Sequence, residues 1–460
     1  MKSGRTGYVS WRARGTADVD LWGGVECSVV RIGDAWRDQL HETGHHRRDN
    51  DLARIAALGI RTLRYPVLWE RISPRHAAQA DWDWHDSRLA ELQRLGIQPI
   101  VGLVHHGSGP HYTGLLDPDF PEKLALHAAS VAARYPWVRA WTPVNEPVTT
   151  ARFSGLYGHW YPHARDLGTF CRMVVNQCLG VQAAMRALRK VVPDAELVQT
   201  EDLGRVFSTP RMRYQADHEN LRRWLSLDLL CGHVDSHHPS WRMLRDAGVP
   251  ESSLDRLLEA DATPDIIGIN HYLVSDRYLD HAWQRYPHEF AGGNGRDRYA
   301  DVEAVRVVPP PGPLGPEARL WEAWERYRLP LAITEAHHGA AEMIECVRWL
   351  REIWHAAECL QEQGVDIRAV TIWSLFGAMD WRSLLREAAG AYEPGVFDCR
   401  FDPPRETALA EAVRGLARDR RIGDFAAYAP GWWRRPERAY AQVHDARMLR
   451  MEGKRHVGSG

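Results

Sequence analysis

The sequence has no excess of charge of either sign and no long apolar run. Its 460 residues include 58 Lys and Arg against 60 Asp and Glu, a formal net charge of −2 at pH 7. That balance gives no electrostatic reason to expect a nucleic-acid or anionic-membrane partner. No apolar run approaches the roughly 20 residues of a membrane-spanning helix, and the N-terminal residues lack the apolar stretch of a signal peptide. We therefore expect a cytoplasmic protein with no nucleic-acid or membrane partner.

Cysteine is scarce, and the usual signatures of metal and nucleotide sites are missing. The seven cysteines are scattered, with no C-x-x-C pair, so reduced thiols in the core are expected. No G-x-G-x-x-G follows the first predicted strand. The 23 histidines include no H-E-x-x-H, and proline interrupts or ends both i, i+4 pairs, which are His159 with His163 and His233 with His237. We expect no cofactor, and a metal-dependent hydrolase is the least favoured alternative.

Short β-rich apolar runs alternate with longer helical patterns along the chain. The predicted strands cover residues 21–30, 60–65, 97–104, 138–144, 195–200, 265–270, 329–334 and 366–373. Helical patterns cover residues 47–58, 84–95, 121–134, 169–191, 221–230 and 342–363. Gly59 and Gly96 mark helix–Gly–strand junctions, because Gly commonly ends helices. The alternation predicts an α/β protein that folds as a (β/α)8 TIM barrel.

One barrel domain accounts for most of the length. We expect an N-terminal segment at residues 1–20, a barrel with extended βα loops at 21–420, and an Arg-rich C-terminal extension at 421–460. A Gly-rich stretch at 292–295 and a Pro-rich run at 309–316 are predicted loops. The sequence contains no repeat of 20–50 residues, so a solenoid is not expected.

Two glutamates follow the predicted fourth and seventh strands. The fourth strand ends in W-T-P-V-N-E-P, which contains Glu146, and the seventh ends in I-T-E-A-H-H-G, which contains Glu335. The C-terminal ends of barrel strands form the active face of such folds. Two carboxyl groups converging there suit the cleavage of a glycosidic bond, in which one must be protonated and the other ionised.

The residues around both glutamates resemble motifs of glycoside hydrolase family 1, one of the clan A barrel glycosidases. Residues 142–147 resemble the acid/base motif T-x-N-E-P of that family. Residues 333–335 resemble the first part of its nucleophile motif I-T-E-N-G, although Ala336 and His337 replace Asn and Gly.

Further segments resemble the same family in the same order, from residue 21 to about 397. Residues 63–72 are similar to R-x-S-x-x-W-x-R-I, and residues 268–272 to G-x-N-Y-Y. Residues 104–106 are similar to Y-H-W, and residues 373–381 to W-S-L-L-D-N-F-E-W. Several motifs in order, each at a predicted strand end, are far more specific than N-E-P alone.

The resemblance implies a retaining β-glycosidase, similar to β-glucosidases and β-galactosidases, that acts on a carbohydrate by double displacement. It implies that Glu146 is the acid/base and Glu335 the nucleophile. It gives supporting roles to Arg64, Asn145 and Tyr272. The substrate-binding residues that it implies are Arg31, His105, Asn270, Trp373, Asp380 and Trp381.

The end of the first strand departs from the family pattern. Arg31 stands where the family carries a Gln, and a guanidinium suits a carboxylate or phosphate better than a pair of hydroxyls. One hypothesis is therefore an anionic glycone, such as a uronic acid; the alternative is that Arg31 pairs with Glu26 or Asp34. The incomplete nucleophile motif also leaves open a transglycosidase or a sugar-binding barrel that does not hydrolyse.

Overall fold

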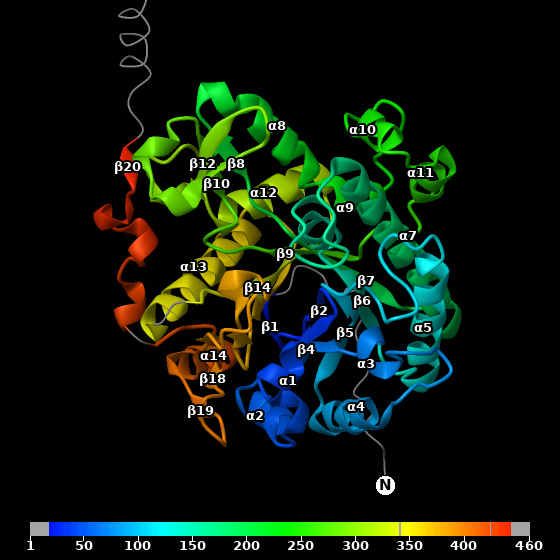
Figure 1. Ribbon diagram of the computed structural model, residues 1–460. Helices are drawn as coiled ribbons and strands as arrows, with labels where there is room; N and C mark the ends of the chain where they lie inside the picture. The colour runs from blue at the N-terminus through cyan, green and yellow to red at the C-terminus, as the bar shows by residue number, and fades with distance from the viewer. Residues whose placement is uncertain (1–17, 340–341, 424, 443–460) are drawn as a thin grey trace, which may run out of the picture.

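The computed structural model describes residues 18–339, 342–423 and 425–442, and its centre is a closed parallel barrel (Figure 1). The strand order is β1–β15–β14–β9–β7–β6–β5–β4, and β4 pairs with β1 to close the barrel. The strands are β1 (Asp20–Gly24), β4 (Thr62–Pro66), β5 (Gln98–His105), β6 (Ala140–Asn145), β7 (Glu196–Asp202), β9 (Ile266–Asn270), β14 (Leu331–Ala336) and β15 (Ile367–Ile372). The predicted (β/α)8 barrel is confirmed.

The barrel interior is filled by side chains from its own strands. One apolar cluster takes a single residue from each of several strands, namely Trp22, Ile100, Ala140, Val198, Ile266, Ala332 and Ala369. Alternate residues of a strand point to opposite faces, so the interior is built in layers. The large indole of Trp22 lies in the same layer as the small side chains of three alanines. The polar side chains lie beyond this apolar layer, at the C-terminal end of the barrel.

Helices surround the barrel and bury their apolar faces against it (Figure 1). They are α1 (Gln39–Glu42), α2 (Asp51–Ala57), α3 (Trp69–Ile72), α4 (Asp83–Leu95), α5 (Phe120–Arg134), α6 (Pro147–Ala151), α7 (Leu167–Val191), α8 (Arg213–Arg222), α9 (Leu225–Leu230), α10 (Trp241–Asp246), α11 (Glu251–Leu258), α12 (Pro316–Tyr327), α13 (Met343–Glu362) and α14 (Ala408–Asp419).

Three predicted elements differ from the structure. The first strand is shorter than expected, because the chain leaves the barrel after Gly24 and forms the hairpin β2 (Val29–Ile32) and β3 (Ala35–Asp38). The helix predicted at 221–230 is divided between α8 and α9. Part of the Gly-rich stretch predicted as a loop is a strand, β11 (Ala291–Gly293), paired with β12 (Arg298–Glu303).

Further small sheets lie in the loops that follow barrel strands. Strands β8 (Val206–Ser208) and β10 (Arg277–Asp280) join β11 and β12 in one four-stranded sheet. The other pairs are β13 (Val307–Val308) with β20 (Ala441–Gln442), β16 (Ala378–Met379) with β17 (Tyr392–Glu393), and β18 (Phe397–Asp398) with β19 (Arg405–Glu406).

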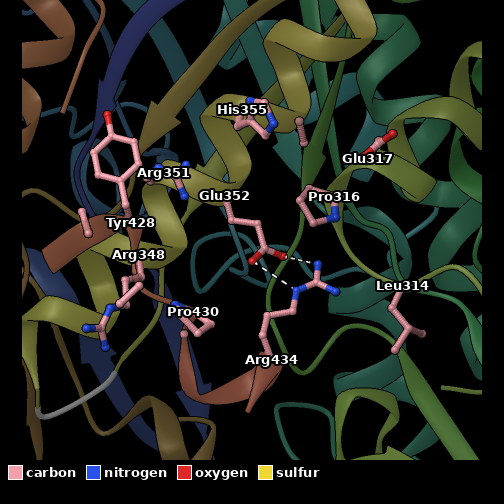
Figure 2. A pocket seen from close by; sticks show the side chains of 14 residues that line it. Leu314, Pro316, Glu317, Arg348, Arg351, Glu352, His355, Tyr428, Pro430 and Arg434 are labelled. Carbon is pink, nitrogen blue, oxygen red and sulfur yellow. Dashed lines mark hydrogen bonds and ion pairs between the residues drawn. The ribbon is translucent and has the colours of Figure 1, made fainter. Parts of the chain in front are cut away.

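The described part of the C-terminal extension packs along α13. Arg434 forms an ion pair with Glu352 at 2.6 Å (Figure 2). The Trp433 indole N–H donates to the same carboxylate at 2.7 Å. Trp432 donates its indole N–H to His338, in the loop that follows β14, at 3.0 Å. The boundary of the predicted extension stays a prediction, and residues 1–17 and 443–460 lie outside the described chain.

The seven cysteines are all free thiols, and four of them are buried. Within the described residues, no helix is both long and apolar enough to cross a membrane.

Candidate active site

The two predicted catalytic glutamates lie at the C-terminal ends of barrel strands. Glu146 directly follows β6, and Glu335 is the penultimate residue of β14. Their residues are 3% and 2% exposed, so both carboxyl groups are almost removed from bulk water. Glu146 has left-handed backbone angles (φ 48°, ψ 67°). Such a conformation costs a non-Gly residue about 1–3 kcal/mol and persists where surrounding packing enforces it.

Glu335 is held by a cation and a hydroxyl group. Arg64, in β4, donates from Nη1 to Oε1 of Glu335 at 2.8 Å, and the Tyr272 hydroxyl donates to Oε2. The same guanidinium donates to Asn145 Oδ1 at 2.7 Å, which joins the ends of β4, β6 and β14. Burial raises the pKa of Glu335, and the net shift is upward, although Arg64 and the Tyr272 hydroxyl oppose it by stabilising the ionised form.

Among the residues that the structure describes, Glu146 has no cationic partner of that kind. Asn270 donates from Nδ2 to Oε1 of Glu146 at 2.5 Å, and His106 Nε2 lies 3.6 Å from Oε2. Burial, reinforced by the negative charge of Glu335, raises the pKa of Glu146 well above its ordinary value. Burial also lowers the pKa of His106 to about 3, which leaves that imidazole neutral. The protonated form of Glu146 is therefore favoured.

Aromatic side chains flank the two glutamates. The rings of His105 and Trp373 are stacked, with centroids 5.6 Å apart and an interplanar angle of 8°. The Arg64 guanidinium carbon lies 4.9 Å from the centroid of the Trp373 ring. Trp381 contacts His106 edge to face, with centroids 5.6 Å apart. The structure thus brings these predicted binding residues to the same end of the barrel as the glutamates.

Comparison with known proteins identifies the family of this chain. The family model described as glycosyl hydrolase family 1 matches residues 29–392. The chain belongs to that family. A 6-phospho-beta-glucosidase from Dickeya chrysanthemi is 25% identical over 72% of this chain and 75% of its own length. Beta-glucosidase 47 from Arabidopsis thaliana is 23% identical over 77% of this chain and 72% of its own length.

Solved structures of this glycosyl hydrolase family have the same fold. A beta-glucosidase from Thermotoga maritima, in complex with deoxynojirimycin, superposes with a TM-score of 0.68 at 17% identity. The match covers 87% of this chain and 98% of the other. As a member of the family, the protein is a glycoside hydrolase of the β-glycosidase type.

Arg31 of this family 1 member lies on the β2–β3 hairpin. Its Nε donates to the carbonyl of Gly33 at 2.9 Å, and its Nη2 lies 3.4 Å from Asp34 Oδ1. The guanidinium also lies over the Tyr161 ring, 3.9 Å from the centroid. The structure therefore includes the internal pairing with Asp34 that the sequence left open, and it does not join Arg31 to the cluster of Arg64 and Glu335. A role for Arg31 in binding substrate stays a prediction.

Asp380 is enclosed by partners of its own. Its Oδ2 accepts from Arg37 Nη2 at 2.8 Å, and its Oδ1 accepts from the Ala391 N–H at 2.7 Å. Arg37 also pairs with Glu42 at 2.5 Å. Burial raises the pKa of Asp380, but the backbone N–H and Arg37 outweigh it, so the net shift is downward. Both oxygens of this carboxylate already have protein partners.

Asn270 contacts protein atoms on both sides of its amide. Besides donating to Glu146, it accepts from the Thr334 hydroxyl at 2.6 Å. Asn145 accepts from Thr200 Oγ1 at 2.8 Å as well as from Arg64, and its Nδ2 lies 3.4 Å from His105 Nε2. The two asparagines therefore help to hold Glu146 and Arg64 in place.

Sequence reasoning missed an acidic residue and a His–Glu pair beside Glu335. Glu26 is 3% exposed, and burial together with the charge of Glu335 raises its pKa to about 7, against opposing hydrogen bonds from Ser28. His337 Nε2 lies 3.1 Å from Glu393 Oε2, a partner that raises the pKa of His337 against the effect of burial. An acid inside the otherwise apolar run G-V-E-C-S-V-V was the available signal for Glu26.

The spaced histidine pairs do not form a ligand cluster. Within residues 18–442, apart from the short masked gaps, no group of three or more His, Cys, Asp or Glu side chains is arranged to hold a metal ion. His163 Nε2 instead accepts from the Gly33 N–H at 2.9 Å, and His233 lies 3.9 Å from Asp228.

Proposed function

We propose that this protein is a retaining β-glycosidase that works by double displacement. The unequal environments of its two buried carboxyl groups carry the proposal. Glu335 accepts hydrogen bonds from a guanidinium and a phenol, which favour its ionised form, whereas Glu146 accepts one from a neutral amide and has a raised pKa, which favours its protonated form. Two carboxyl groups whose environments separate their protonation states can serve as nucleophile and general acid.

In the first step, the Glu335 carboxylate attacks the anomeric carbon and forms a glycosyl ester. The bond from that carbon to the glycosidic oxygen breaks, and Glu146 donates its proton to that oxygen, so the aglycone leaves as an alcohol. The ester removes the negative charge on Glu335 that had helped to raise the pKa of Glu146. The pKa of Glu146 falls as a result, and its carboxylate becomes a base.

In the second step, Glu146 takes a proton from water while the water oxygen attacks the anomeric carbon. The ester bond breaks, the carboxylate of Glu335 is restored, and the sugar is released with its original configuration. Arg64 and Tyr272 stabilise the carboxylate that leaves. Asn145, held by Arg64, would contact the sugar 2-hydroxyl.

The glycone subsite, which binds the sugar on the non-reducing side of the cleaved bond, would be lined by side chains around this centre. The stacked rings of His105 and Trp373 offer a flat apolar surface and polar edges to a sugar ring. Trp381 extends that surface beside His106. Asn270 and Asp380 already form hydrogen bonds with protein atoms, so we expect them to position other residues of the subsite.

The proposal is tested with aryl β-glycosides of different sugars. The set should include β-glucoside, β-galactoside and 6-phospho-β-glucoside, because β-glucosidases and a 6-phospho-beta-glucosidase are among the relatives. NMR of the first sugar formed should show the β-anomer before mutarotation. A first product with the α-configuration would reject the double displacement.

A transglycosidase is the second candidate. His337 stands where the nucleophile motif of the family has Gly, and this departure favours retaining the alternative. Its imidazole lies directly after β14, two residues beyond Glu335, and pairs with Glu393 at 3.1 Å. Adding an alcohol acceptor distinguishes the two: transfer products that outnumber the free sugar at low acceptor concentration identify a transglycosidase.

A further inference from the structure

The helix that follows Glu146 is capped by a residue of the neighbouring strand. Glu146 is the N-cap residue of α6, the position whose side chain usually accepts from the first N–H groups of a helix. Its carboxyl group makes no such bond within the described chain. Glu201, the penultimate residue of β7, accepts instead from the Val148 N–H at 2.9 Å and from the Thr149 N–H at 3.2 Å. The cap of α6 therefore comes from β7.

Strand β7 provides the partners of the N–H groups with which this helix begins. The Glu146 N–H donates to the Thr200 carbonyl at 3.2 Å, Pro147 has no N–H, and the next two N–H groups donate to Glu201. These first N–H groups have no partner inside a helix, so the external acceptors fix where the helix starts. The backbone on both sides of Glu146 is thus tied to β7.

This capping arrangement leaves the Glu146 carboxyl group free for chemistry. The left-handed backbone of Glu146 (φ 48°, ψ 67°) is a conformation that persists only where surrounding contacts enforce it. Because these angles set the direction in which α6 leaves β6, the bonds that hold the start of α6 also hold the angles. A carboxyl group that capped the helix could not also protonate a glycosidic oxygen, and Glu201 removes this conflict.

Glu201 is itself held by a third element. The residue is 1% exposed, and the Ser226 hydroxyl, in α9, donates to Oε2 of Glu201 at 2.7 Å. Burial raises the pKa of Glu201 to about 7, while the three hydrogen bonds that it accepts act in the opposite direction. After burial and the charge of Glu335, the negative charge of Glu201 is among those that raise the pKa of Glu146.

We infer that Glu201 positions the general acid: by capping α6 it holds Glu146 in the backbone conformation from which the carboxyl group protonates the glycosidic oxygen. Both oxygens of Glu201 are engaged by protein donors, so it is a positioning residue that acts through Glu146. This inference rests on the proposed β-glycosidase activity and adds to it the residue that keeps the acid in place.

The test compares Glu201→Gln with the wild type and with Glu70→Gln as a matched control. Gln keeps the size of the side chain but replaces one accepting oxygen by an NH2 group, so one backbone N–H of α6 loses its acceptor. Glu70 is another buried acid, 6% exposed, whose pKa burial also raises to about 7, but it lies in α3 and accepts from the Gly109 N–H at 3.0 Å. The measured quantity is kcat/KM for an alkyl and for a dinitrophenyl β-glycoside.

Glu201→Gln should impair the donation of the proton more than the rest of the reaction. The kcat/KM for the alkyl glycoside should fall by about tenfold or more relative to that for the dinitrophenyl glycoside, because only the alkyl leaving group needs a well-placed acid. The alkaline limb of the pH profile should move to lower pH, because a negative charge that opposes ionisation of Glu146 is removed. Glu70→Gln should leave the ratio within about twofold and the limb in place.

A double-mutant cycle shows whether Glu201 acts through Glu146. In the Glu146→Gln background, the added change Glu201→Gln should lower each rate by less than about twofold, since the acid that Glu201 positions is already absent. If Glu201→Gln does not fold, Glu201→Asp, which keeps the charge and withdraws both oxygens by one methylene, should give the same selective loss on the alkyl glycoside.

Several results would overturn the inference. If the wild type is active and Glu201→Gln leaves the ratio of the two rates unchanged, or leaves the alkaline limb in place, Glu201 does not position the acid and the proposed function still stands. A loss that persists in full in the Glu146→Gln background has the same meaning. A wild type that hydrolyses no β-glycoside rejects the proposed function and this inference with it.

Discussion

Replacing Glu146 by Gln removes the proposed general acid while changing little else. Burial and the charge of Glu335 raise the pKa of Glu146, which favours a neutral carboxylic acid, and Gln is also uncharged and similar in size. The Gln oxygen can still accept from Asn270 Nδ2. The free energy of unfolding should therefore change by less than about 1 kcal/mol, the scale of one exchanged neutral hydrogen bond. Thermal unfolding followed by circular dichroism checks this.

The loss of activity should depend on the leaving group. General acid catalysis contributes about 10²–10⁴-fold in rate. An alkyl β-glycoside needs a proton on its departing oxygen and should lose the whole of that factor in kcat/KM. The dinitrophenolate of a dinitrophenyl glycoside leaves as a stable anion and needs no proton. The rate of formation of the glycosyl ester from this substrate should therefore fall by less than about tenfold. Steady-state rates over a series of leaving groups, with burst kinetics for the most activated one, measure the difference.

The pH profile gives an independent check on the same variant. Glu146 must carry a proton to act, so wild-type kcat/KM should fall as the pH rises through the raised pKa of that group. Glu146→Gln should lack this alkaline limb, while Glu70→Gln should retain it. Equal losses for alkyl and dinitrophenyl glycosides, or an unchanged alkaline limb, would refute the assignment of Glu146 as the acid.

Three further predictions concern the nucleophile and the hairpin. Glu335→Gly should abolish hydrolysis while the fold is kept, and added azide should restore turnover of an activated glycoside to give the α-glycosyl azide; undiminished hydrolysis would contradict the assignment. Tyr272→Phe removes a donor that favours ionised Glu335, so the acid limb of kcat/KM should move to higher pH and the rate should fall by about tenfold or more; an unmoved limb would count against it. If Arg31 binds an anionic sugar, Arg31→Gln should lower the activity on a β-glucuronide relative to that on a β-glucoside. If the wild type prefers the glucoside and the variant leaves this ratio unchanged, Arg31 is a structural residue of the hairpin.

Local sequence was sufficient for the barrel and for the position of its two glutamates. Each predicted strand is a short apolar run bounded by Gly or by a helical pattern, and these are features of neighbouring residues. Once the strands alternate with helices, the parallel barrel places every strand end on one face. Glu146 and Glu335 therefore follow from their places after β6 and β14, without knowledge of any long-range contact.

Only the tertiary structure decided which side chains meet those glutamates. Arg64 and Glu335 are 271 positions apart, and Arg37 and Asp380 are 343 positions apart, so each pair depends on how the closed barrel and its loops are assembled. The same is true at the end of β1, where the chain turns out of the barrel after Gly24. That turn carries Arg31 onto Tyr161 and ties Glu26 to Ser374, because the path of a loop is set by the contacts it makes and not by the periodicity of its residues.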